Sequence, residues 1–448
     1  MTPACFLSIK IISLQDNFIW GVFMLYKKIS DLTQADIEQI MLREADFFKV
    51  MDDVGKIISE VEKDGDAALK KLTKKFDGAD IVDIEVDDLE IEDAYSEVKP
   101  ELIEALEDAA ANIASYHGSQ VEAGLSLTEV EPGLILGYKV TPLSSAGVYV
   151  PGGTAAYPST ALMTVIPAKV AGVMEVIVCT PPNKEGKINP LTLVAADMAG
   201  SDRIFKVGGA QAIAAMAFGT ETIPSVDKIV GPGSVYVTAA KMLVRNTVEI
   251  DFPAGPSEVV ILADETGEAG WIAADMIAQV EHDPKATAIL ITTSQKLAEK
   301  VKKELEAQSK VLPRREIIEK SLEHAAILIA NHLDEGIVTS DRLAPEHLEI
   351  MVADPLSVLE KIQHAGSISV GKYAPAAAGD YAAGTNHVLP TGGYARMVSA
   401  LNVSHFTKKS CVQIISEFGL KSLKDTIVKL AEAEGFQGHV ASVEKRFQ

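Results

Sequence analysis

The sequence predicts an α/β protein with two Rossmann-like parallel-sheet domains and a small helical C-terminal extension. From about residue 135 onward, short β-branched runs alternate with alanine-rich helical stretches, the pattern of βαβ units in parallel sheets. The 448 residues, 47% of them apolar, are too many for one compact core. A Pro- and Gly-containing stretch at 249–257 divides the strands into two groups and marks a crossing between two domains.

The elements follow from this alternation. Strands before the crossing are predicted at 146–150, 175–180, 203–207 and 227–230. The helices that accompany them are predicted at 160–171, 190–199, 209–218 and 234–245. After the crossing, strands are predicted at 258–263, 287–292, 325–330, 348–352 and 367–370, with a helix at 269–281. Charged helical pattern fills 31–115 and returns over 404–448.

These patterns give provisional domain boundaries. We assign 24–148 and 257–400 to a larger α/β domain, 149–256 to an incomplete Rossmann-like domain, and 401–448 to a helical tail. Residues 1–23 are patchily apolar, too polar to span a membrane, and lack the basic start and cleavage site of a secretory signal. We expect this extension to be disordered or wrongly included, with Met24 as the natural start.

Charge and cysteine content restrict the partners and the compartment. Acidic residues number 63 against 41 basic ones, so the net charge of −22 disfavours nucleic acid and anionic membranes as partners. Cys5, Cys179 and Cys411 are far apart and form no CxxC pair, which favours a reducing cytoplasm over a disulfide framework. Cys179 lies in an apolar strand-like run and is expected to be a small buried hydrophobe.

Three glycine turns connect predicted strands to helices in the first group, at 147–153, 207–211 and 230–234. Each turn presents backbone N–H groups at a helix start, where an anion can bind. None has the GxGxxG spacing of the usual dinucleotide fingerprint. Taken singly, each is an ordinary strand–helix turn; the three together favour a nucleotide site of unusual form.

The segment 379–393 carries Asp380, Asn386, His387 and several glycines, with almost no aliphatic bulk. It cannot build a core, and its glycines allow close approach to a ligand. Its polar groups suit a metal or a polar substrate. The alternative is a plain glycine-rich surface loop.

Three further pairs of polar residues are candidates for chemistry. Gln279 and His282 share a helix face at spacing i, i+3, which suits a divalent metal, although solvent-facing polar residues would look the same. Glu346 and His347 place a carboxylate and an imidazole just before a strand, where they could transfer protons; the alternative is a helix-start acid beside an incidental histidine. Glu434–His439 forms a flexible bend with a potential ligand at each end.

Together these segments resemble the histidinol dehydrogenase family from about residue 24 to the end. The motifs occur in the family's order: VYVPGG at 148–153, VGGAQAIAA at 207–215, AGPSEV at 254–259, QxEH at 279–282, APEHLE at 344–349, GDYAAGTNHVLPT at 379–391 and EGxxxH at 434–439. The resemblance implies oxidation of L-histidinol to L-histidine in two steps via L-histidinal, each step reducing one NAD. The family needs no catalytic cysteine.

The resemblance also assigns residues. It implies a zinc ion held by Gln279, His282, Asp380 and His439, which anchors the substrate. It implies that His347 takes the alcohol proton and that Glu346 activates the water that adds to the aldehyde. The residues implied to contact substrate are Ser257, Gln279, His282, His347, Asp380, His387, Glu434 and His439. The residues implied to contact NAD are Tyr149, Gln211 and Ser234.

The family is a homodimer whose C-terminal tail crosses to the neighbouring subunit, which would bring Glu434 and His439 into the partner's site. Ser234 stands where the family has asparagine and offers one donor where an amide offers two. A first alternative is a same-fold zinc- and NAD-dependent dehydrogenase of another amino or sulfonated alcohol. A second is a non-catalytic zinc or nucleotide binding protein, against which the presence of Glu346 and His347 argues.

Overall fold

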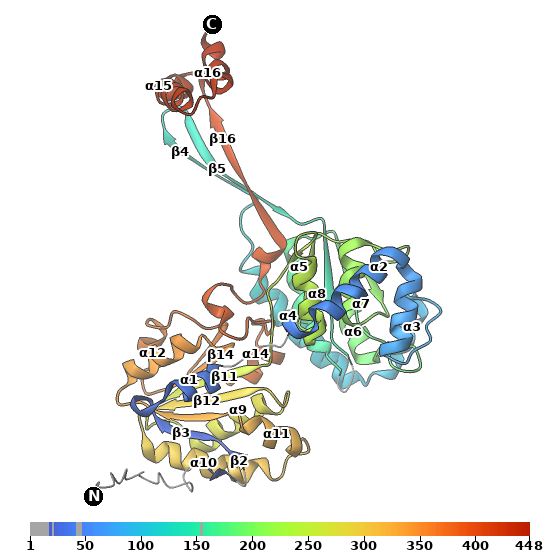
Figure 1. The fold of residues 1–448 in the computed structure, drawn as a ribbon, viewed down its shortest axis with the longest axis vertical. Helices are drawn as coiled ribbons and strands as arrows, with labels where there is room; N and C mark the ends of the chain where they lie inside the picture. Colours follow the sequence, from blue (N-terminus) through green and yellow to red (C-terminus); the bar gives the residue numbers. More distant parts are fainter. Residues whose placement is uncertain (1–17, 20–21, 42–46, 153–155) are drawn as a thin grey trace, which may run out of the picture.

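The computed structural model describes residues 18–19, 22–41, 47–152 and 156–448, and contains two parallel sheets and a projecting arm (Figure 1). The first sheet has the order β10-β9-β6-β7-β8, and its paired strands run parallel. Its strands are β6 (Ser145–Tyr149), β7 (Glu175–Cys179), β8 (Arg203–Phe205), β9 (Lys228–Val230) and β10 (Glu249–Ile250). In chain order this is 5-4-1-2-3, the doubly wound order without its sixth strand, with the switch point between β6 and β9.

Helices cover both faces of the first sheet. One face packs against α3 (Asp88–Glu97), α4 (Pro100–Gly118), α5 (Pro158–Ala171) and α6 (Pro190–Met198). The other face packs against α2 (Phe47–Phe76), α7 (Gly209–Phe218) and α8 (Val235–Val244). Because α2, α3 and α4 bury their apolar faces here, the structure differs from our assignment of 24–148 to the larger domain.

The second sheet has the order β15-β14-β11-β12-β13-β3, again parallel throughout its pairs. Its strands are β3 (Leu25–Lys28), β11 (Glu258–Ala263), β12 (Thr287–Thr292), β13 (Ala326–Ile329), β14 (His347–Met351) and β15 (Ser367–Val370). Helices α9 (Ala269–Val280), α10 (Gln295–Ser309) and α11 (Arg315–Leu322) cover one face, while α1 (Gln34–Met41), α12 (Leu333–Leu343) and α13 (Pro355–Leu359) cover the other. The remaining helix of this region is α14 (Ala376–Tyr381).

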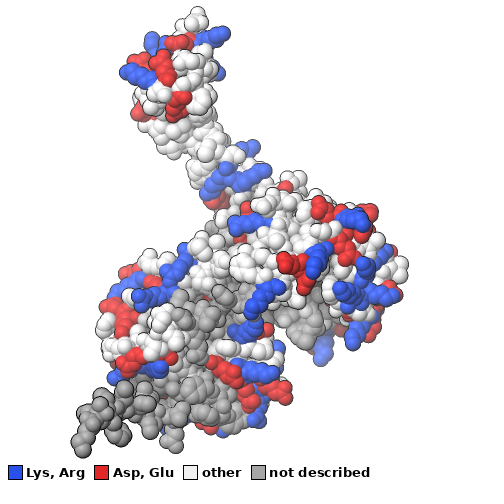
Figure 2. Space-filling model, in the orientation of Figure 1, with Lys and Arg blue, Asp and Glu red and all other residues white. Residues whose placement is uncertain are grey.

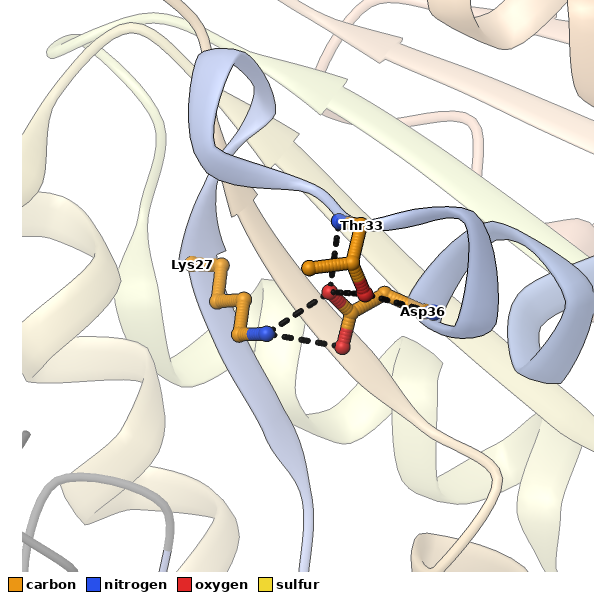
Figure 3. Close-up of polar contacts among 3 residues, drawn as sticks. All are labelled: Lys27, Thr33 and Asp36. Atoms are coloured by element: carbon orange, nitrogen blue, oxygen red, sulfur yellow. Dashed lines mark hydrogen bonds and ion pairs between the residues drawn. The ribbon is translucent and has the colours of Figure 1, made fainter. Parts of the chain in front are cut away.

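Met24 is buried in the core beside β3, and the edge strand is tied to α1 by polar contacts (Figure 3). Lys27 Nζ lies 2.7 Å from Asp36 Oδ2, and the same carboxylate oxygen accepts the Thr33 backbone N–H at 2.7 Å. Our expectation for residues 1–23 falls mostly outside the described residues; within them, β1 (Phe18–Ile19) and β2 (Val22–Phe23) form a short antiparallel pair.

The arm is built from three antiparallel strands and a helical tip (Figure 1). Strand β5 (Leu134–Pro142) pairs with β4 (Leu125–Glu131) on one side and with β16 (Thr407–Ile415) on the other. Helices α15 (Glu417–Ala433) and α16 (Gln437–Glu444) form the tip, far from both parallel sheets. The helix predicted over 401–448 is therefore wrong at 407–415, which forms strand β16. This strand pairs with β5, which is distant from it in the sequence.

The predicted α/β class is confirmed, as are the strands and helices predicted in both sheets, within a few residues at their ends. Most of these runs are fully buried, so their apolar sequence reflects burial on both faces of a parallel sheet. Within the described ranges, no helix is both long enough and apolar enough to cross a membrane.

Candidate active site

The candidate residues of the second sheet gather at its amino edge. Ser257 immediately precedes β11, Glu346 immediately precedes β14, and His347 is the first residue of β14. The parallel pairing puts these strand starts side by side. Helix α9 runs back from the carboxyl edge of the sheet, so Gln279 and His282 at its end reach the same place. Helix α14 follows β15 in the same way and carries Asp380 in its last turn.

Three potential metal ligands converge here. Gln279 is 4% exposed, whereas His282, just beyond the helix end, is exposed to solvent. Burial of part of its imidazole lowers the pKa of His282, and the ring lies close enough to His347 and His387 for its charge to add to burial in lowering the pKa of both. Burial raises the pKa of Asp380 to about 7, because a carboxylate removed from water is costly to ionise. One imidazole nitrogen and two oxygens from these residues fit a zinc ion.

His347 is buried beside them. Its Nε2 lies 3.7 Å from Asp380 Oδ1. Burial, followed by the charges of His387 and His282, lowers the pKa of His347 to about 3. The imidazole is therefore neutral at pH 7 and able to accept a proton.

Glu346 is held by reciprocal hydrogen bonds with Glu258. The Glu258 backbone N–H donates to Glu346 Oε2 at 2.8 Å, and the Glu346 backbone N–H donates to Glu258 Oε1 at 3.1 Å. Glu258 is 1% exposed and Glu346 6%. Sequence reasoning missed Glu258, although a carboxylate opening an otherwise apolar strand was a visible signal.

His387 joins the second sheet to the first domain. Its Nδ1 lies 2.8 Å from the Asp380 carbonyl oxygen, so Nδ1–H is the donor and Nε2 is left as an acceptor. The Thr160 hydroxyl, in the first turn of α5, lies 3.4 Å from that Nε2. Helix α5 begins at the carboxyl edge of the first sheet. The contact between Thr160 and His387 therefore places this edge next to the residues at the amino edge of the second sheet.

The candidate nucleotide residues lie at the carboxyl edge of the first sheet, around its switch point. Tyr149 ends β6, and its hydroxyl accepts the Gly209 N–H at 3.0 Å at the start of α7. Gln211 lies in the first turn of α7 but is only 2% exposed, whereas Ser234, before α8, is exposed. At Gly231 (φ 117°), a Cβ would collide with the Tyr149 carbonyl, so this close approach requires glycine.

These features fit a dinucleotide in general form. The starts of α7 and α8 lie at the carboxyl edge of the first sheet, which is the edge where α/β sheets bind nucleotides. Residues 153–155, which include the last residue of the glycine turn predicted at 147–153, lie outside the described residues. The buried Tyr149 and Gln211 side chains offer a ligand at this edge little surface, whereas the Ser234 hydroxyl is an exposed donor.

Glu434 and His439 are exposed at the helical tip of the arm, remote from the other candidates in the same chain (Figure 1). Within the described part of the chain, no three His, Cys, Asp or Glu side chains are grouped so as to hold a metal. A set of four ligands that includes His439 therefore cannot form inside one subunit in this conformation.

Two further buried carboxyl groups lie behind the site. Asp275, one turn before Gln279 on α9, hydrogen-bonds Glu349 on β14, and Glu349 Oε1 also accepts the Ala376 N–H at 2.7 Å at the start of α14. Burial is the first cause that raises the pKa of each, to about 6 for Asp275 and about 8 for Glu349. The pair thus ties together the three elements that carry Gln279, His347 and Asp380, and sequence reasoning missed it.

An open cleft of about 620 Å³ borders the 379–393 segment on its other side. Its lining includes Tyr116, Ser367, Thr385 and Asn386, but none of the candidate metal or proton-transfer residues. We therefore locate the chemistry by the side-chain cluster at the amino edge and not by this cleft.

The fold and the site together define a two-sheet α/β protein of the oxidoreductase type, with a cluster of polar side chains at the amino edge of its second sheet. The family profile described as histidinol dehydrogenase matches residues 41–447. Histidinol dehydrogenase of Methanosarcina mazei is 54% identical over 426 residues, covering 95% of this chain and 98% of that protein. Histidinol dehydrogenase of Methanocaldococcus jannaschii is 51% identical over 426 residues, with coverage of 95% and 99%.

A solved structure agrees. The crystal structure of histidinol dehydrogenase from Elizabethkingia anophelis matches with a TM-score of 0.90 at 38% identity, over 95% of this chain and 98% of that chain. The chain belongs to the histidinol dehydrogenase family. This confirms the resemblance inferred from the motifs, and it supports an oxidoreductase of histidine biosynthesis.

Proposed function

We propose that this protein oxidises L-histidinol to L-histidine in two NAD-dependent steps, with L-histidinal between them. The observation that carries the proposal is the convergence of Glu346 and His347 with His282 and Asp380 at one sheet edge, in a member of this family. The contact between Thr160 and His387 joins that edge to the carboxyl edge of the first sheet, where we place the nucleotide.

The residues act in the following order. His347, neutral and buried, takes the proton of the substrate hydroxyl in the first oxidation. NAD, when bound at the carboxyl edge of the first sheet, supplies the hydride acceptor in both steps. Glu346 takes a proton from the water that adds to the aldehyde carbonyl, while His347 returns its proton to the carbonyl oxygen to give the hydrate. His347, neutral again, then takes a hydroxyl proton of the hydrate as the second hydride leaves. Two hydrides, and so four electrons, leave the substrate.

The metal set consists of Gln279, His282 and Asp380 of one subunit, with His439 of a second copy. Bound zinc would anchor the amine and imidazole nitrogens of the substrate and so fix the reacting carbon. Ser257, His387 and Glu434 would complete the substrate contacts, His387 with the tautomer set by its bond to the Asp380 carbonyl. Tyr149, Gln211 and Ser234 would border the dinucleotide.

The proposal includes a homodimer with shared sites. The arm exposes large apolar side chains along its sheet and its tip: Leu125, Leu127, Leu136, Ile414, Phe418, Leu430 and Phe436. Charged side chains gather at the tip and near the base, and the surface between them is mostly uncharged (Figure 2). Exposed apolar surface of this kind marks an interface, and the reach of the arm suits delivery of Glu434 and His439 to a partner.

We further propose a cytoplasmic enzyme without nucleic acid or membrane partners. Cys179 and Cys411 are free thiols, and the net charge of −22 would repel polyanions.

The test is NAD reduction by the purified, zinc-loaded protein with L-histidinol, counting NADH against histidine formed. Two NADH per histidine, lost on chelation and restored by zinc, would support the proposal as a whole. Zinc binding without turnover of histidinol would instead favour a same-fold dehydrogenase of another amino or sulfonated alcohol.

A further inference from the structure

We infer that Glu258 is a positioning residue that orients Glu346 for activation of water. The inference rests on the proposed function, since it concerns the role of Glu346 in the second oxidation. Its basis is the reciprocal pair of hydrogen bonds, in which each glutamate carboxylate accepts the backbone N–H of the other, at 2.8 and 3.1 Å.

The backbone around Glu346 is fixed from several sides. Its carbonyl oxygen accepts the Ser367 N–H at 2.8 Å, and the Pro345 carbonyl accepts the Gly366 N–H at 2.9 Å. Ala344, two residues earlier, has the left-handed conformation (φ 45°, ψ 62°) that turns the chain out of α12. The Glu258 carboxylate holds the remaining backbone group, the Glu346 N–H, so the segment cannot swing away from β11.

The Glu258 N–H then sets the direction of the Glu346 side chain. A glutamate has three side-chain torsions, and an immobile donor at 2.8 Å selects the conformers that turn Oε2 toward β11. A general base must stay within hydrogen-bond reach of the proton it removes, so such preselection favours the reaction.

The burial of the Glu258 carboxylate indicates that its hydrogen bonds offset a large desolvation cost. It is 1% exposed at the head of the strand EVVILA, whose other members are apolar and buried. Burying a carboxylate costs free energy unless hydrogen bonds compensate. On the other side of β11, Glu258 lies opposite Thr287 of β12, whose side chain is 7% exposed. Among the described hydrogen bonds none joins Thr287 to Glu346, so Thr287 is a suitable control position.

Loss of the Glu258 carboxylate should change the rates of the two oxidation steps by different amounts. His347 is the first residue of β14 and is held in register between Val259 and Ser367. It keeps its place without the Glu258 side chain, so removal of the alcohol proton should continue. Activation of water by Glu346 should suffer.

The experiment compares Glu258→Met, Glu258→Asp, Glu258→Gln and, as a control, Thr287→Val in the zinc-loaded dimer. Oxidation of L-histidinol to the aldehyde and oxidation of supplied L-histidinal are measured separately, with zinc content and thermal unfolding. Methionine removes the acceptor, aspartate draws it back by one methylene, and glutamine retains an acceptor oxygen. Hydrogen exchange of the 344–349 backbone is measured on the same proteins without substrate.

We expect E258M and E258D to slow aldehyde oxidation by about 10- to 100-fold, since misorienting a general base loses part of the roughly 100- to 10,000-fold that such a base contributes. Alcohol oxidation should slow by less than about threefold. E258Q and T287V should stay near wild type in both steps. Exchange at 344–349 should accelerate in E258M and E258D only. If E258M does not fold, the E258D variant still tests the inference.

Equal slowing of both steps, or an E258Q variant as impaired as E258M, would overturn the inference. Unchanged exchange at 344–349 in E258D would also overturn it, and this readout does not depend on the substrate. If the wild-type protein does not oxidise histidinol, the proposed function is contradicted. The hydrogen-exchange data would still decide whether the Glu258 side chain restrains the backbone around Glu346.

Discussion

The two parallel sheets present opposite edges to the candidate site. The first sheet offers its carboxyl edge, where Tyr149 and Ser234 lie beside helix starts. The second offers its amino edge, where Ser257, Glu346 and His347 lie at strand starts. The contact of Thr160 with His387 joins the two edges. The general rule that α/β sheets bind ligands at their carboxyl ends therefore predicts the position of the proposed nucleotide site, but not that of the proposed metal and proton-transfer groups.

The difference has a physical basis. A strand–helix turn at a carboxyl edge offers backbone N–H groups, which suit the phosphates of a nucleotide. The amino edge offers helix ends and strand starts whose side chains, such as Gln279 and His347, can be donors to a metal or to substrate. The proposed nucleotide would thus be bound mainly by backbone N–H groups at one edge, and the proposed metal and substrate by side chains at the other.

The largest expected effect comes from removing the arm tip. Ending the chain after Ser416 deletes α15 and α16, and so Glu434 and His439. We expect loss of dehydrogenase activity and of tightly bound zinc, because the amino edge alone supplies an incomplete ligand set. Zinc analysis, gel filtration and activity measure this. A truncated monomer that kept zinc would contradict the shared site.

A mixing experiment tests the same idea without truncation. His347→Ala and His439→Ala should each be inactive alone, but mixed and re-associated subunits should recover about one quarter of the wild-type rate, since half of randomly formed dimers would hold one intact site of two. No recovery in verified heterodimers would show that each arm serves its own subunit. Gln437→Ala, exposed on the same helix as His439, is the control.

A smaller effect should separate the two edges of the second sheet. Asp380→Asn at the amino edge should weaken zinc binding by more than about 100-fold, since even residues behind metal ligands contribute roughly 10- to 100-fold. Asp264→Asn at the carboxyl edge, where Asp264 accepts the Thr266 and Ala353 N–H groups, should leave zinc affinity unchanged. Competition with a chelating dye measures both. Equal affinities in the two variants would move the metal elsewhere.

The carboxyl pair behind the site predicts a pH effect on the metal-free protein. Burial, then Asp275, raises the folded pKa of Glu349 to about 8 from its ordinary 4.5, so between these values the folded state binds more protons than the unfolded state. The Glu349 carboxyl should therefore contribute a fall in the free energy of unfolding as pH rises from 5 to 8, of about 1.4 kcal/mol per pH unit. The lowered pKa of His347 acts in the opposite sense below about pH 6.5, so the contribution of Glu349 is read from the difference between variants. In Glu349→Gln this fall should be smaller, as measured by urea unfolding. The exposed Glu360→Gln should behave as wild type, and an unchanged slope in E349Q would refute the assignment.

The smallest effect concerns the junction of the edges. Thr160→Val removes the hydroxyl that faces His387 Nε2 at 3.4 Å, a bond worth about 1 kcal/mol. We expect KM for histidinol to rise about fivefold by that figure, with kcat nearly unchanged. Thr164→Val, one turn further along α5, removes a hydroxyl that bonds only to backbone carbonyls of its own helix. A kcat effect in T160V larger than its KM effect would contradict a role in positioning alone.

The sequence by itself determined the α/β class, the strands and helices of both sheets, and the identity of the polar side chains. Fully buried strands such as 258–263 and 287–292 carry their signal locally, as unbroken apolar β-branched runs. The family resemblance then joined distant motifs, such as 279–282 and 379–391, that no periodicity relates.

Only the tertiary structure decided which of these residues meet and on which edge. The arm was not foreseen, because β4, β5 and β16 are half-exposed strands whose pairing joins 125–142 to 407–415. Glu258 and Glu349 are acids in apolar strands, and their partners Glu346 and Asp275 became visible only through parallel register and helix packing. Local sequence fixes the conformation that a segment prefers, whereas a site depends on contacts between segments, whose free energy arises only when the chain packs.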